Sequence, residues 1–231
     1  MIKKANNILT PVYLEVGTKR VFAGALDWPG WCRSGRDEAS ALARLVDYTP
    51  RYAAVLKAAG LEFTAPSAVA HLSVVERLPG NFDTNFGSLS AIPTGDSLPL
   101  VGEELEHQQA ILEACWRAFD AVLAAAQGKP LRTGPRGGGR DLDGIARHVR
   151  DGAKSYLYRL GLRFEAPDSG EIADDLLRVQ LACRQALETA SHTALPSTGP
   201  HGGVRWKPRY FVRRSAWHLL DHAWEIEDRV S

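Results

Sequence analysis

Apolar residues recur along the chain with two periods, which divide it into a strand-rich N-terminal part and a helical C-terminal part. Residues 11–16 and 20–26 alternate loosely between apolar and polar positions and are separated by a glycine, which predicts a β-hairpin. The apolar run 68–75 predicts a third strand. Between these runs, helical spacing predicts one helix that is capped by Asp37 and ends near Ala59. The expected module is therefore a small α/β unit with the order strand–strand–helix–strand.

From about Glu103 onward, the apolar residues follow a helical period throughout. Glycine, proline and capping residues bound these segments, as is typical of helix ends. The predicted helices cover residues 103–127, 142–160, 172–191 and 208–229. Four amphipathic helices of this length predict a four-helix bundle. The expected fold class is therefore α+β, with the α/β module preceding the bundle.

The stretch between the two parts is dense in Gly, Pro, Asn, Asp and Ser. It also contains Phe82, Phe86 and Ile92, which a disordered linker would normally lack. An ordered connection is therefore expected. The predicted organisation is a module over residues 1–78, a connection over 79–102 and the helical domain over 103–231.

Composition excludes several classes of protein. The formal net charge is +1, so no overall field favours nucleic acid or an anionic membrane as a partner. No apolar run approaches the length of a membrane-spanning helix. The 3 cysteines are scattered along the chain, which fits neither a disulfide framework nor a thiolate metal cluster and favours three small buried side chains. The chain is expected to be cytoplasmic and to act on a small molecule; the sequence leaves its oligomeric state open.

The last predicted helix contains the most distinctive pattern of polar residues. His218 and His222 are four residues apart and share one face, at the edge of an apolar stripe that includes Leu219 and Ile226. Because a metal site needs at least three protein ligands, the third must come from another helix. His148, at the edge of the apolar face of the second long helix, is the best candidate. These three histidines predict a site for a divalent transition metal, with zinc, nickel and iron all compatible with imidazole.

Other polar residues lie close to these positions in the sequence. Glu225 is a candidate partner of a metal ligand or an acid–base group, although it can also simply pair with Arg229 at an exposed site. Tyr156, Arg214 and Arg229 are the candidate substrate-binding residues. For Arg214 and its basic neighbours, a solvated face is the simpler interpretation, and a clamp for an anionic substrate is the alternative. His107 is the reserve ligand.

The residues from about 103 to 231 resemble the DinB-like family of four-helix bundles. That family binds a divalent metal with one histidine from the second helix and a His-x-x-x-His pair from a later helix. Here these motifs are residues 145–151 (IARHVRD), with His148, and residues 218–222 (HLLDH). The usual ending His-x-x-x-His-Arg-x-Gln is not kept, because Ala-Trp-Glu follows the pair. The resemblance therefore indicates the metal site more than the substrate.

The resemblance implies a three-histidine site with positions open to water or a thiol. Some members of the family are S-transferases that use low-molecular-weight thiols such as mycothiol or bacillithiol. Others are isomerases, or the bundle half of iron-dependent sulfoxide synthases, and many have no assigned activity.

The N-terminal part resembles HicB-type antitoxins, which have a partial ribonuclease-H-like fold. Those proteins open with a strand hairpin, an Asp-x-Pro-Gly-Cys turn and a helix rich in Glu and Ala. Here the turn is residues 27–32 (DWPGWC), followed by Gly35, Glu38 and Ala41. The DNA-binding tail of that family is absent, so no repressor role is carried over.

Two hypotheses of function follow from these patterns. The first is a metal-dependent enzyme with its site at His148, His218 and His222, which catalyses thiol transfer or a related transferase, isomerase or hydrolase reaction. The second is a non-catalytic interaction or scaffold protein, in which the histidines hold a structural ion or none. A metal with an open coordination position would favour the enzyme, and a fourth protein ligand would favour the scaffold.

Overall fold

The computed structural model describes residues 9–133, 139–165, 168–193, 198 and 203–231. The chain forms two compact units, Met1–Gly95 and Asp96–Ser231. The boundary between them lies within the stretch 79–102 that the sequence predicts as a connection. The structure is mixed α+β, as expected, with a sheet in the first unit and helices dominating the second. Each unit is described separately below.

The first unit is built on a four-stranded sheet with the order β3-β2-β1-β4. The strands are β1 (Thr10–Val16), β2 (Val21–Ala25), β3 (Cys32–Gly35) and β4 (Leu72–Pro79). Strands β1 and β2 form the predicted antiparallel hairpin, and β4 lies parallel to β1. Helix α1 (Glu38–Asp47) begins at a capping box in which Asp37 accepts hydrogen bonds from Ser40, and it packs on β2 and β3.

The first unit differs from the sequence prediction in four places. The third strand is predicted over residues 68–75, but Val69–His71 form a 3₁₀ turn and β4 runs from Leu72 to Pro79. Strand β3 was missed because it is short and follows directly after the Pro-Gly turn. The predicted single helix is two helices, α1 and α2 (Thr49–Ala58), since Pro50 lies in the first turn of a new helix and cannot continue the hydrogen bonds of the old one. The predicted connection contains a short helix, α3 (Phe82–Phe86), and a 3₁₀ turn, Thr94–Ser97.

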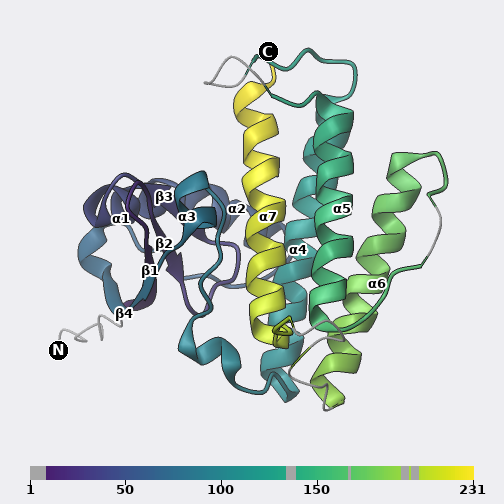
Figure 1. Cartoon of the computed structure of the whole chain (residues 1–231). Helices are drawn as coiled ribbons and strands as arrows, with labels where there is room; N and C mark the ends of the chain where they lie inside the picture. Colours follow the sequence, from purple (N-terminus) through teal and green to yellow (C-terminus); the bar gives the residue numbers. More distant parts are fainter. Residues whose placement is uncertain (1–8, 134–138, 166–167, 194–197, 199–202) are drawn as a thin grey trace. The chain divides into compact units, whose positions relative to one another are not determined.

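In the described residues of the second unit there are four long helices, whose bounds agree closely with the prediction. They are α4 (Gly102–Ala126), α5 (Leu142–Leu160), α6 (Ile172–His192) and α7 (Pro208–Arg229). Figure 1 shows the four helices lying side by side. Helix α7 packs on α4 and α5, and α6 packs mainly on α5. The fully buried side chains between them include Ile111, Phe119, Ile145, Val179 and Phe211.

Helix α7 is far more buried than an amphipathic surface helix. Its apolar stripe is buried as expected, but Arg213 and Arg214 are also buried, with only 4% and 9% of their surface exposed. The interpretation of this basic run as a solvated face is therefore wrong. Arg213 donates hydrogen bonds of 2.6 and 2.8 Å to the two carboxylate oxygens of Asp96, which is 3% exposed. The buried charge of Arg213 on α7 is therefore paired with the carboxylate of Asp96, the first residue of the same unit.

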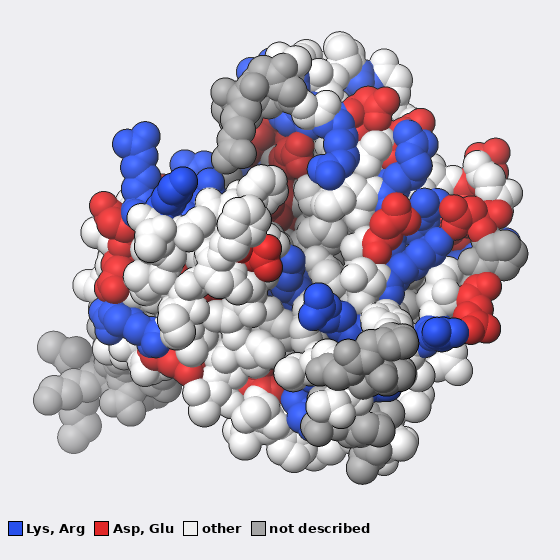
Figure 2. Space-filling model, in the orientation of Figure 1, with Lys and Arg blue, Asp and Glu red and all other residues white. Residues whose placement is uncertain are grey.

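Charged side chains of both signs are intermixed over the helices on the face drawn in Figure 2. One network joins α5 to α6 through Arg150, which contacts Asp168 and the buried Asp175 at 3.3 and 3.0 Å. This distribution agrees with the small formal net charge. Within the described ranges, no helix has the length and apolar character needed to span a membrane.

Candidate metal centre

Three histidines from two helices meet in the second unit. His148 comes from α5, and His218 and His222 come from α7. One ligand atom of each lies within 4.8 Å of those of the other two. The Nε2 atoms of His148 and His218 are 3.2 Å apart. Residues separated by 70 positions in the chain are therefore brought to one point, as the sequence predicts.

A glycine on α5 allows the two helices to approach at this point. Gly152 lies one turn after His148, and the ring of His218 packs against it. A Cβ atom at position 152 would lie 2.6 Å from Cε1 of His218 and 3.1 Å from its Nδ1. Glycine normally weakens a helix interior. Here its lack of a side chain makes room for the imidazole.

The donor set fits a divalent transition metal. Two nitrogens bound to one tetrahedral ion at about 2.0–2.1 Å stand about 3.3 Å apart, close to the separation of the His148 and His218 Nε2 atoms. Imidazole nitrogens suit zinc, nickel and iron. His148, His218 and His222 form the one cluster of three or more metal-ligating side chains in the searched part of the chain, and it has no fourth member there.

Burial keeps two of these imidazoles in the neutral form that binds metal. Desolvation is the main cause that lowers the pKa of His148 to about 4, and His222 and Arg140 lower it further. Desolvation also lowers the pKa of His218 well below its usual value, with His222 and Arg214 adding to the effect. At neutral pH both rings therefore keep a lone pair available for an ion.

Glu225 fixes the orientation of His222. Its Oε2 lies 2.8 Å from Nδ1 of His222, and because an ionised carboxylate only accepts, Nδ1 carries the proton and Nε2 is free to bind a metal. The hydrogen bond from His222 is the largest cause that lowers the pKa of Glu225, so the carboxylate is ionised. The sequence allowed Glu225 to be a partner of a ligand or an acid–base group, and the geometry matches the first of these.

Arg229 holds Glu225 in place. It donates a 2.6 Å hydrogen bond to Oε1 of Glu225 and further bonds to the backbone carbonyls of Arg132 and Arg140. The interpretation of Glu225–Arg229 as an exposed pair is wrong, because only 10% of the Arg229 side chain is exposed. Contact between Arg229 and a substrate stays a prediction.

Tyr156 and Arg214 lie beside the three histidines. The ring of Tyr156 is 5.5 Å from that of His218, and the guanidinium of Arg214 lies over the rings of Tyr156 and Trp217 at 5.1 and 4.5 Å. Desolvation raises the pKa of Tyr156, which keeps its phenol protonated. Their role as substrate-binding residues stays a prediction.

The other described histidines and the cysteines are not part of the cluster. His71, His107 and His192 are not members of it, so the reserve ligand His107 is not brought to the site. His201 lies outside the described residues. All three cysteines are buried, as expected, and none forms a disulfide. Burial raises the pKa of Cys183 to about 12, so this thiol stays protonated.

The chain was compared with protein-family models, curated proteins and solved structures. No family model, curated protein or solved structure matches the chain.

The lowered histidine pKa values predict how the metal-free protein responds to acid. In the unfolded chain His148 and His218 have pKa values near 6.5, whereas in the folded chain the pKa of His148 is about 4 and that of His218 is also lowered. Between these values the unfolded state binds more protons, so the free energy of unfolding falls as the pH drops through this window. Urea unfolding of metal-free protein is expected to show a loss of at least about 2 kcal/mol between pH 7.5 and pH 5, the amount that His148 alone contributes.

A pair of variants separates this effect from general acid sensitivity. His148→Gln removes one of the titrating groups and should reduce the loss, whereas His192→Gln, at an exposed position, should not. Equal losses in both variants and the unmodified protein would contradict the assignment to the buried histidines.

Proposed function

We propose that the protein is a metal-dependent enzyme whose C-terminal helices form a DinB-like four-helix bundle around His148, His218 and His222. The N-terminal unit is a HicB-like module in this proposal. The substrate is a small molecule, with a low-molecular-weight thiol as the leading candidate, and the reaction is thiol transfer or a related transferase, isomerase or hydrolase reaction.

One observation carries the proposal: the convergence of three imidazoles with their ligand atoms within 4.8 Å. The hydrogen bond from His222 to Glu225 supports it further, since metal-ligating histidines commonly donate their other ring N–H to a carboxylate. The cluster contains three protein donors among the described residues. A three-ligand set leaves room for water or a substrate, which favours catalysis over a closed structural site.

The chain's own residues have separate tasks in this scheme. His148, His218 and His222 would hold the ion, which when bound acts as a Lewis acid that favours deprotonation of a thiol or water. Glu225 keeps the proton of His222 on Nδ1. The phenol of Tyr156 can donate a hydrogen bond, and buried Arg214 places positive charge beside it, which suits an anionic substrate group.

Elemental analysis tests the first step of this proposal. The purified protein is expected to contain about one first-row divalent ion per chain, or to take one up after removal with a chelator. His222→Ala should lose metal retention while the far-UV circular dichroism of the helices is kept. Activity assays with thiols would follow on the metal-loaded protein.

Two results would refute the metal site. The first is unmodified protein that stays metal-free after incubation with zinc, nickel and iron(II). The second is unchanged metal content in His222→Ala together with an unchanged content in His148→Ala.

A further inference from the structure

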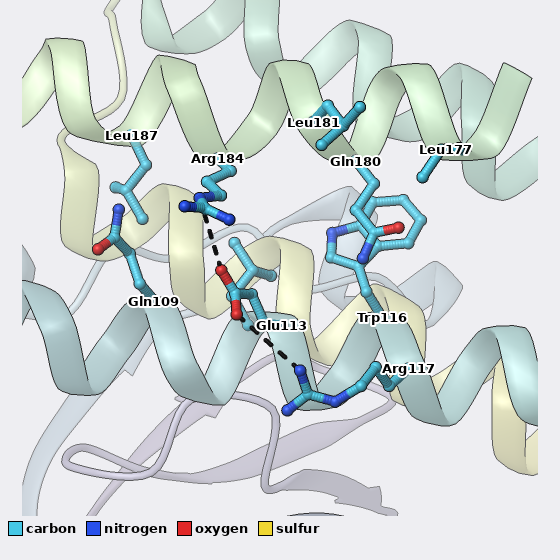
Figure 3. Close-up of a pocket in the computed structure, with 10 residues that line it drawn as sticks. Gln109, Glu113, Trp116, Arg117, Leu177, Gln180, Leu181, Arg184 and Leu187 are labelled. Atoms are coloured by element: carbon cyan, nitrogen blue, oxygen red, sulfur yellow. Dashed lines mark ion pairs between the residues drawn. The ribbon is translucent and has the colours of Figure 1, made fainter. Parts of the chain in front are cut away.

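The outward face of α6 has exposed apolar residues at its centre. Leu177 and Leu181 are 54% and 56% exposed, although they are one turn apart and would normally be buried together. They border a cavity of about 180 Å³ between α4 and α6, and Leu112 also lines it. Trp116 and Leu187 are further apolar residues of the lining (Figure 3). Because α6 packs mainly on α5, this apolar surface along α4 stays open.

Charged residues flank the two leucines in a symmetric order. Asp174 precedes Leu177 by three positions, and Arg184 follows Leu181 by three. At about 100° per residue these four side chains share one face of the helix, and all four are exposed. Val179, midway between them, is fully buried on the opposite face.

This order is self-complementary. When two copies of α6 lie antiparallel about a two-fold axis at the level of Val179, Leu177 of one copy faces Leu181 of the other. The same operation places Asp174 opposite Arg184 at both ends of the contact. A two-fold interface requires such a pattern, since each residue of the patch must fit its counterpart in an identical surface.

The flanking charges are available for such a contact. Asp174 forms no ion pair within the part of the chain that the structure describes. Arg184 lies 3.6 Å from Glu188 and 3.8 Å from Glu113, longer than the separations of about 2.7–2.9 Å typical of charge-assisted hydrogen bonds. Figure 3 shows Arg184 reaching from α6 toward Glu113 at the edge of the cavity. Its guanidinium is therefore loosely held and can turn toward a partner's carboxylate.

We propose that the face of α6 formed by Asp174, Leu177, Leu181 and Arg184 is a homodimer interface, and that a second copy of this chain binds it with its own α6 antiparallel. The leucines of the two copies cover each other and the apolar mouth of the α4–α6 cavity. Two Asp174–Arg184 pairs fix the antiparallel register, since a parallel arrangement places like charges together. The proposal is independent of the metal site.

Sedimentation velocity of the full-length protein tests the interface. The unmodified protein is expected to shift from monomer to dimer as its concentration rises. Leu181→Glu should raise the dissociation constant at least about tenfold, because it places a charge in the apolar centre. The matched control is Tyr158→Glu on α5, which puts glutamate in place of a 49% exposed aromatic residue and should leave the dissociation constant unchanged.

A charge exchange tests the register. Asp174→Arg and Arg184→Asp each place like charges opposite one another and should weaken the dimer about tenfold. The double variant restores opposite charges and is expected to return the dissociation constant to within about threefold of the original. Circular dichroism and metal content should stay unchanged in every variant, which separates this result from the fate of the metal site.

Three outcomes would overturn the proposal. The first is a protein that stays monomeric at the highest soluble concentration. The second is a dimer that resists Leu181→Glu, which would place the interface on another face. The third is a double charge variant that dimerises no better than either single variant, which would exclude the antiparallel register.

Discussion

Replacing Gly152 by alanine is expected to weaken metal binding about 100-fold, the upper range for changes next to a metal ligand. The new Cβ would lie 2.6 Å from Cε1 of His218, a separation that forces the imidazole or the helix to move. Either movement takes His218 away from His148, with which it shares the 3.2 Å contact of Nε2 atoms. Metal titration of the chelator-treated protein measures the loss.

The same substitution has the opposite expected effect on the helix itself. Alanine is favoured over glycine in a helix interior by about 1 kcal/mol, so α5 should be intrinsically more helical. A protein that keeps its helical circular dichroism but loses metal would therefore locate the defect at His218 and not in global unfolding. Ser155→Ala, at an exposed position of α5, is the matched control and should bind metal normally.

Unchanged affinity in Gly152→Ala would contradict the close approach of α5 and α7 at the site. Loss of affinity in both variants would also contradict it, because Ser155→Ala adds no atom and alters only an exposed side chain.

The helices of the second unit could be predicted because the residues that start and end each helix lie next to it in the sequence. Asp141 caps α5, Gly161 ends it, and Pro208 begins α7, and each of these signals acts within a few residues. Strand β3 and the break between α1 and α2 were missed for a related reason. Strand β3 has four residues, too few to show a period of two. The helical apolar spacing continues across Tyr48, although Pro50 has no N–H with which to continue the hydrogen bonds of α1.

The three histidines could also be predicted, since the spacing of His218 and His222 is a local property of one helix. The side chains that surround these histidines could not be predicted from the sequence. Whether Gly152 faces His218 depends on how α5 and α7 are aligned, which the apolar pattern of neither helix specifies. The burial of Arg213 and Arg214 was missed because a basic run is normally solvated, and the carboxylate of Asp96 that satisfies Arg213 is distant in sequence.

Asp96→Ala is expected to destabilise the helical unit by about 3–5 kcal/mol. The carboxylate and Arg213 are 3% and 4% exposed, so removing the carboxylate leaves a guanidinium buried without its opposite charge. A desolvated charge without its partner costs far more than the pair contributes in water. Urea unfolding of the full-length protein, followed by helical circular dichroism, measures this loss.

Two further variants decide whether burial is the cause. Arg209 also lies on α7, and Glu104→Ala removes its carboxylate partner. Because half of the Glu104 side chain is exposed, the loss in unfolding free energy should stay near or below about 1 kcal/mol. The double variant Asp96→Ala with Arg213→Met removes both buried charges and should recover most of the stability lost in Asp96→Ala, because an apolar pair has no desolvation cost to offset. If Asp96→Ala cost no more than Glu104→Ala, the Asp96–Arg213 pair would behave as a surface salt bridge, and the buried position of Arg213 on α7 would be refuted.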